Sequence, residues 1–187
     1  DLHVRSRRQR QMCIRDRLIS AHLGNWEIAG SLLKKISTKL NVVMFDGEAE
    51  RLKNILKKTV GTPNFNIISI KNDLSHVFAI KNALARGEMV CIHGDRFMEG
   101  SKVIKTKMFD QTLNLPAGPF QIPATLKVPY TVVFAIKTGT NSYHFTATEP
   151  KVETNSQKIA EHFVSELEEK VVKHPEQWFN YHQFFKA

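Results

Sequence analysis

Residues 65–93 read FNIISIKNDLSHVFAIKNALARGEMVCIH, and this stretch decides the fold. An alternating pattern over Phe65–Ile70 predicts a strand, and an amphipathic pattern over 74–85 predicts a helix. Met89–His93 is then a continuous apolar run, typical of a strand at the buried centre of a parallel sheet. The stretch therefore predicts a β-α-β unit with a parallel crossover.

The same alternation of patterns extends in both directions along the chain. Further strands are expected at 18–21, 42–45, 130–136 and 143–148, further helices at 26–40, 48–59, 119–127 and 155–172, and two short strands around a turn within 102–115. No repeat or linker interrupts this order. The sequence predicts one α/β domain with a mixed, mostly parallel sheet flanked by helices.

The composition is that of an ordinary globular domain, with 42% hydrophobic and 24% charged residues. No apolar run approaches the roughly 18 residues of a spanning helix, so the chain as given is not predicted to cross a membrane. Cys91, on a predicted buried strand, has no partner for a disulfide framework once residues 1–17 are set aside, and it fits a reducing compartment.

Residues 1–17 differ from the rest, with six arginines, no lysine and no usable apolar period. They resemble a translated sequencing adapter, so we expect a disordered, non-native segment followed by the domain at 18–187. The alternative is a genuine basic arm for nucleic acid or a presequence. Without the segment, 21 basic and 16 acidic residues remain, and the net charge falls from +9 to +5. This charge suits an anionic membrane surface or a phosphorylated substrate.

Residues 22–27 read HLGNWE and lie where a predicted strand passes into a helix. On one continuous helix, the spacing of five residues would place His22 and Glu27 on different faces. They can meet only if His22 lies in the turn, which Gly24 would permit, and Glu27 in the first helical turn. A carboxylate there could orient the imidazole as a general base. The alternative is that His22 merely ends a strand and Glu27 is an ordinary first-turn acid.

Residues 93–102 read HGDRFMEGSK and directly follow the most buried predicted strand. Ligands bind at the carboxyl ends of strands in open α/β sheets, so Asp95 and Arg96 are candidate substrate-binding residues. The alternative is an Asp–Arg pair that only organises a turn. The run is not a phosphate-binding P-loop, because five residues separate its glycines and Lys102 follows the serine.

Two further segments carry weaker signals. Gly118 opens a predicted helix, where a small residue would let a ligand approach backbone N–H groups; the alternative is a loop terminator. Residues 174–185 read HPEQWFNYHQFF, and this aromatic segment would form either an interfacial belt against a membrane or a docked tail. The remaining histidines lack metal-ligand spacing, and we expect neither a metal nor an organic cofactor.

These segments, taken in order, resemble the lysophospholipid acyltransferase superfamily, and within it the late, lauroyl- or myristoyl-type acyltransferases of lipid A biosynthesis. Residues 18–27 look like the His-x4-Asp/Glu block of the superfamily, here with Glu. Residues 94–96 stand where the branch usually has an Asp-Gln pair, with Arg96 in place of Gln. Residues 116–120 and the strand after them match a later block, and 175–186 are similar to the closing Pro-Glu-Gln-Tyr/Trp…Phe-Lys signature.

The resemblance implies a glycerol-3-phosphate/lysophospholipid acyltransferase-like fold and transfer of a fatty acyl chain from a thioester to a lipid hydroxyl or amine. His22 would take the proton from the acceptor, and Glu27 would orient the ring and stabilise its charge. The thioester would be attacked directly, without a covalent enzyme intermediate. Asp95 matches a family position tied to the site, with Arg96 in support. Arg51 would supply a basic residue near a donor or acceptor phosphate.

The resemblance also implies the partners and the location. The donor would be acyl carrier protein or acyl-coenzyme A, and the acceptor a lipid of the lipid A type or a related envelope lipid. We expect work at the cytoplasmic face of the bacterial inner membrane, no nucleic acid partner, and a chain that lacks the N-terminal anchor of the family. Two alternatives stay open: a hydrolase with the same His/Glu pair, and a non-catalytic basic membrane-binding module.

Overall fold

The computed structural model describes residues 17–25, 38–47, 65–71, 73–140, 142–181 and 184–185. The Arg-rich residues 1–16 and the helix expected at 48–59 lie outside these ranges, as does nearly all of the helix expected at 26–40.

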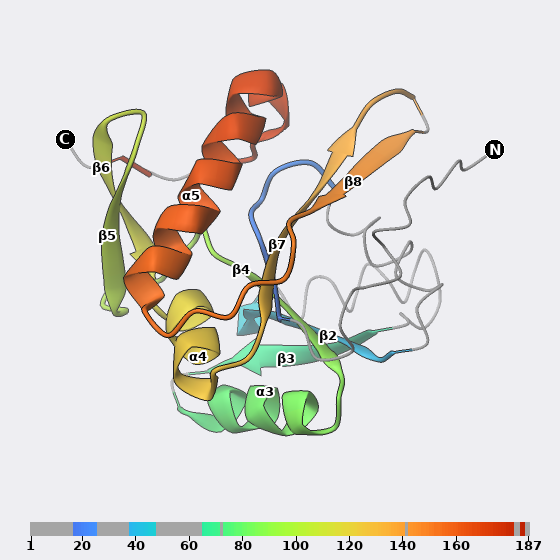
Figure 1. The fold of residues 1–187 in the computed structure, drawn as a ribbon, viewed down its shortest axis with the longest axis vertical. Helices are drawn as coiled ribbons and strands as arrows, with labels where there is room; N and C mark the ends of the chain where they lie inside the picture. The colour runs from blue at the N-terminus through green and yellow to red at the C-terminus, as the bar shows by residue number, and fades with distance from the viewer. Residues whose placement is uncertain are drawn as a thin grey trace.

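A six-stranded sheet lies at the centre of the described chain (Figure 1). Its strands are β1 (Arg17–Ser20), β2 (Leu40–Phe45), β3 (Phe65–Ile70), β4 (Met89–His93), β7 (Tyr130–Lys137) and β8 (Tyr143–Ala147). Their order across the sheet is β3-β2-β4-β1-β7-β8, and all neighbours are parallel except β7 and β8. The predicted α/β class with a mixed, mostly parallel sheet is confirmed.

Within the described ranges, three α-helices and a separate hairpin pack around this sheet. They are α3 (Ser75–Ala85), α4 (Gly118–Leu126), α5 (Ser156–Lys173) and the hairpin of β5 (Val103–Met108) and β6 (Gln111–Pro116). Helix α3 lies against β3 and β4, while α5 lies against α4 and β5 (Figure 1). The short 3₁₀ helix η3 (Pro175–Gln177) follows α5 directly.

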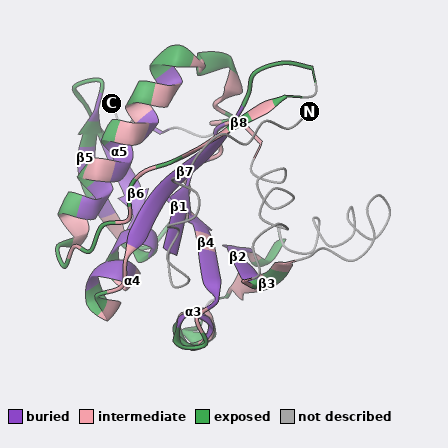
Figure 2. Ribbon diagram, turned by 45° about the vertical axis from the view of Figure 1, so that its right-hand side comes forward, coloured by how far each residue is buried: buried purple, intermediate pink, exposed green. Residues whose placement is uncertain are grey.

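The strand β1 runs through the middle of the core, and all four of its residues are buried. Ile19 faces the cluster that also holds Phe120 of α4 and Phe163 of α5. Leu18 faces the opposite side, with Met89 and Val133 of the two neighbouring strands. Figure 2 shows this burial along β1, β4 and β7, whereas the outer faces of α3 and α5 are exposed. The carboxyl end of β1 is therefore held from both sides of the sheet.

Strand β2 begins earlier than its apolar pattern predicts. Leu40 was expected at the end of a helix, but it is the first residue of β2, in register with Phe65 of β3 and Met89 of β4. The expectation was wrong at this residue because pairing on both sides and burial outweigh a helical period that Leu40 also fits. The strands β3 and β4 have the bounds that the sequence predicts.

Arg17 is the first residue of β1, whereas the expected strand begins at Leu18. Its N–H donates to the Pro129 carbonyl at 3.2 Å, and only 1% of the residue is exposed. Among the described residues, none of its three guanidinium nitrogens has a hydrogen-bond partner. Burial lowers the pKa of Arg17 to about 9. A buried charge without a partner is costly, so this position favours an apolar side chain.

Replacement of Arg17 by Met should raise the free energy of unfolding at pH 7 by about 2 kcal/mol, within the range seen when apolar side chains replace buried charges. Burial lowers the pKa of Arg17 in the folded protein, so the unfolded chain holds this proton to a higher pH. The cost of the buried charge should therefore not grow with pH, and any change in the advantage of the variant on raising the pH should be a decrease. Urea unfolding at pH 7, 9 and 10 measures this difference.

The exposed Lys71 provides the matched control, because its replacement by Met should change stability by less than about 0.5 kcal/mol. An Arg17→Met variant no more stable than the wild type at pH 7 would contradict the interpretation of a costly buried charge.

Candidate active site

His22 lies just beyond the carboxyl end of β1, the strand between β4 and β7. The strand β4 ends beside it, because Ser20 and His93 are in register. The Gly94 N–H donates to the Ser20 carbonyl at 2.8 Å and keeps the two chains together where they leave the sheet. This pairing brings Asp95, two residues past β4, next to His22.

The side chain of Asp95 is bonded to His22 twice. Its Oδ1 lies 2.8 Å from the His22 Nδ1, and its Oδ2 accepts the main-chain N–H of His22 at 2.8 Å. The exposed fraction of the side chain is 1% for Asp95 and 14% for His22. Because an ionised carboxylate only accepts hydrogen bonds, Nδ1 carries the proton and donates it, and Nε2 of the neutral ring is left as an acceptor. The pair thus has the geometry of an oriented general base.

The charges around this pair are set by burial and by the two histidines. Burial raises the pKa of Asp95, but the hydrogen bonds from His22 outweigh it, and the pKa lies below its usual value. The ring of His93 lies 4.1 Å from that of His22, centroid to centroid. Burial lowers the pKa of His93 to about 3. At neutral pH, Asp95 is therefore charged and His93 is neutral.

The turn that carries His22 packs directly against β7. Gly24 has a φ of +72°, which L side chains rarely adopt, and the Asn25 N–H donates to the Ala135 carbonyl at 2.8 Å. A Cβ atom at Gly24 would lie 2.0 Å from that carbonyl oxygen. Only glycine fits this position, both for its backbone angle and for its contact with β7.

The C-terminal segment covers the same turn from the other side. The Gly24 N–H donates to the Gln177 carbonyl at 2.9 Å, and the Phe179 N–H donates to the His22 carbonyl at 2.8 Å. Arg96 joins this segment to the Asp95 loop, because its Nη2 donates to the Phe179 carbonyl at 2.8 Å. The aromatic C-terminal segment therefore docks on the site, one of its two expected arrangements, at least through residue 179.

A cavity of about 890 Å³ opens beside His22. Its described lining comprises His22, Gly24, Asn25, Lys137, Gly139, Thr140, Tyr143, Glu176, Gln177 and Phe179. This volume is typical of a ligand pocket. The lining of this cavity thus comes from the turn after β1, from the end of β7 with the residues that follow it, and from the C-terminal segment.

The predicted site residues do not all come together in the described part of the chain. His22, Asp95 and Arg96 lie together, whereas Gly118 is exposed at the start of α4 and is not among the residues that line the cavity. Glu27 and Arg51 lie outside the described residues, so their roles stay predictions. The sequence singled out Asp95 as a substrate ligand, but did not anticipate its bonds to His22. Its place after a buried strand was the available signal.

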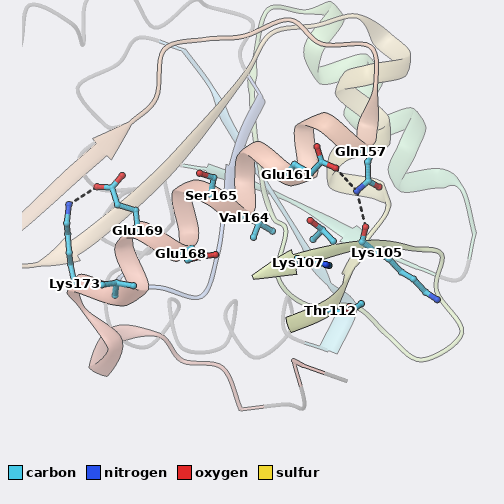
Figure 3. Close-up of a pocket in the computed structure, with 12 residues that line it drawn as sticks. Lys105, Lys107, Thr112, Gln157, Glu161, Val164, Ser165, Glu168, Glu169 and Lys173 are labelled. Atoms are coloured by element: carbon cyan, nitrogen blue, oxygen red, sulfur yellow. Dashed lines mark hydrogen bonds and ion pairs between the residues drawn. The ribbon is translucent and has the colours of Figure 1, made fainter. Parts of the chain in front are cut away.

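A second cavity, of about 840 Å³, lies between α5 and the β5–β6 hairpin (Figure 3). Several polar groups in it are bonded to one another. The Gln157 amide donates to the Lys105 carbonyl at 2.9 Å, and the Lys173 ammonium lies 2.7 Å from a Glu169 oxygen. Its described lining includes neither His22 nor Asp95. We therefore assign the chemistry to the cavity beside His22.

One family comparison matches nearly the whole chain. The sequence model of the bacterial lipid A biosynthesis acyltransferases matches residues 3–187, which include the His22 turn, Asp95 and the C-terminal segment. The match begins inside residues 1–17, whose non-native origin stays a prediction, as does the lauroyl- or myristoyl-type branch. No curated protein matches the chain.

The contact of Gly24 with β7 can be tested against a second glycine of similar backbone angle. Gly100 has a φ of +79°, but a Cβ atom there would meet nothing within 4 Å. We expect Gly100→Ala to lower the free energy of unfolding by about 1 kcal/mol, the cost of the backbone angle alone. Gly24→Ala adds a clash with the Ala135 carbonyl and should cost about 3 kcal/mol.

Calorimetric melting of both variants measures the difference. Equal losses of stability would show that the backbone of β7 can move away from a side chain at position 24 at little cost. The close contact between Gly24 and Ala135 would then not be what requires glycine.

Proposed function

The chain belongs to the bacterial lipid A biosynthesis acyltransferase family, and from this we propose that it moves a fatty acyl chain from a thioester to a lipid hydroxyl or amine with His22 as the general base. That the protein is an acyltransferase follows from the family. The observation that carries the mechanism is the pair of 2.8 Å bonds between His22 and Asp95. With Nδ1 donating to Asp95, Nε2 is the nitrogen that can accept a proton when the ring is neutral.

In the proposed reaction, the acceptor hydroxyl or amine lies against Nε2 of His22. Nε2 takes its proton as the oxygen or nitrogen attacks the thioester carbonyl, and a carbon–oxygen or carbon–nitrogen bond forms. The carbon–sulfur bond then breaks, His22 returns the proton to the sulfur, and the donor leaves as the free thiol. No acyl group is attached to the enzyme.

Asp95 supports the charged stage of this cycle. Once both ring nitrogens of His22 carry a proton, the buried Asp95 carboxylate, which accepts a hydrogen bond from Nδ1–H, stabilises the imidazolium. Glu27, expected from the family pattern to orient the same ring, remains a second proposed partner. The neutral ring of His93 does not compete with His22 for the proton, because its pKa is about 3.

The cavity beside His22 is the proposed site of the reacting groups. Acyl carrier protein and coenzyme A both present the thioester on a phosphate-bearing pantetheine arm, and many acceptor lipids carry phosphate as well. Lys137, at the end of β7, lines the same cavity as His22, and an ammonium group suits a phosphate. Arg51, outside the described residues, stays proposed for the same task.

Replacement of His22 by Gln should lower acyl transfer about 10³-fold, because the base is lost. Asp95→Asn should lower transfer about 10²-fold, because the amide offers one acceptor oxygen to two N–H donors and carries no charge. Transfer is measured with acyl carrier protein and coenzyme A thioesters of a labelled fatty acid and extracted membrane lipids.

Two exposed residues of the same types, His144 and Asp110, provide controls, and His144→Gln and Asp110→Asn should transfer at the wild-type rate. Undiminished transfer by a folded His22→Gln variant would contradict the proposed base. Release of free fatty acid without acylated lipid would favour the hydrolase, with water in place of the lipid.

We also propose that the rim of this cavity meets the cytoplasmic face of the bacterial inner membrane, where the acceptor lipid lies. Phe179, which lines the cavity, is 43% exposed and Tyr181 84% exposed, with 6.3 Å between their ring centroids. Exposed aromatic rings favour the boundary between water and lipid. Within the described part of the chain, no helix is long and apolar enough to span a bilayer.

Tyr181→Ser should weaken binding to vesicles of phosphatidylethanolamine and phosphatidylglycerol about tenfold, which corresponds to about 1.4 kcal/mol of lost ring burial. Phe78 on α3 is 64% exposed, and Phe78→Ser should leave vesicle binding unchanged. Sedimentation with vesicles measures both. Equal binding by the wild type and Tyr181→Ser would place the membrane contact elsewhere.

A further inference from the structure

The side chain of Gln177 completes the edge of β7 beyond the end of β1. Its Oε1 accepts the N–H of Lys137 at 2.8 Å, and its Nε2 donates to the carbonyl of the same residue at 2.9 Å. A side-chain amide thus makes the two bonds that a neighbouring strand would make. Along this edge, β1 pairs with 130–132, Asn25 bonds Ala135 and Gln177 bonds Lys137. On the side that faces the His22 turn, the backbone of Lys137 is therefore held by the side chain of Gln177, while β8 pairs with it on the other side.

The main chain of Gln177 holds the His22 turn at the same time. Its carbonyl accepts the Gly24 N–H at 2.9 Å, and two residues later the Phe179 N–H donates to the His22 carbonyl at 2.8 Å. Between these bonds, Trp178 forms a bridge with Leu23. The main-chain N–H of His22 is held by Asp95 and its carbonyl by the C-terminal segment, so the backbone of the proposed base is fixed at both groups.

We propose that Gln177 is a positioning residue for acyl transfer, which ties the turn of the general base to the end of β7 that forms the cavity wall. The inference rests on the proposed function of His22. Lys137 and His22 line the same cavity from different elements, and Gln177 is bonded to both of those elements. It sets the distance between the base and the wall against which the substrate lies.

A positioning role for Gln177 should affect the rate of acyl transfer, whereas a purely structural role should affect mainly stability. Gln177 is only partly buried, and hydrogen bonds between such groups contribute modestly to stability. Catalysis is far more sensitive, because a shift of about 1 Å between reacting groups can lower a rate about 10²-fold. Loss of the amide should therefore reduce kcat much more than it reduces thermal stability.

Two substitutions separate the two bonds of the amide. Gln177→Leu removes both, while Gln177→Glu keeps an acceptor for the Lys137 N–H and loses the donor to its carbonyl. Both variants also lose the 3.2 Å bond from the Gln177 Nε2 to the carboxylate of the neighbouring Glu176. The matched control is Gln157→Leu on α5, whose amide likewise donates to a backbone carbonyl, that of Lys105, at 2.9 Å. None of the three variants changes His22 or Asp95 itself.

The experiment measures kcat and KM for acyl transfer together with the NMR resonances of the His22 imidazole. We expect Gln177→Leu to lower kcat at least tenfold with a much smaller change in KM, and Gln177→Glu to lie between it and the wild type. The His22 Nδ1–H resonance, which reports the bond to Asp95, should shift in Gln177→Leu. Gln157→Leu should change neither kcat nor the resonance.

The proposal is overturned if folded Gln177→Leu keeps both the wild-type kcat and the wild-type His22 resonance, or if kcat falls only in proportion to the folded fraction. If Gln177→Leu does not fold, Gln177→Glu decides by the same criteria. Absence of acyl transfer by the wild type would instead refute the proposed function, and the His22 resonance would still decide whether Gln177 positions the ring.

Discussion

A buried carboxylate is stable only where hydrogen-bond donors replace the water that it loses, and both oxygens of Asp95 find their donors on His22. The two residues therefore depend on each other. Asp95 orients the His22 ring, and the N–H groups of His22 replace the water that the buried carboxylate has lost. This arrangement requires the end of β1 to lie beside the end of β4, as the register of Ser20 with His93 ensures. The turn, the neutral His93 ring and the C-terminal segment are arranged around this one contact.

The sequence predicts the fold well where periodicity and burial agree. The strands β3 and β4 have the predicted bounds, and α5 begins and ends within one residue of its prediction, because each has a simple pattern over its whole length. Leu40 fitted a helical period yet belongs to β2, since pairing partners are absent from a local pattern. The order of the strands in the sheet could not be predicted from local patterns either, because parallel crossovers allow several different strands to pair with β1.

The site could be predicted in part. The sequence indicates both His22 and Asp95, because each follows a predicted strand and carries a reactive side chain, but the bonds between them depend on the adjacency of β1 and β4. Glu27 is the partner expected for His22 both from its closeness in sequence and from the family pattern, and it lies outside the described residues. The role proposed for Gln177 has no signal in a side-chain motif, because its bonds to Gly24 and Lys137 involve backbone groups of distant segments.

The docking of residues 177–179 on the His22 turn also bears on how the enzyme is made. A ribosome delivers β1 and β4 first, and domains begin to fold from the N-terminal side during synthesis. The partners of the His22 carbonyl and the Gly24 N–H, which are Phe179 and Gln177, follow much later along the chain. A nascent chain can therefore pair its central strands while the His22 turn is still unsupported on one side, and the turn is held from both sides only after residue 179 has been synthesised.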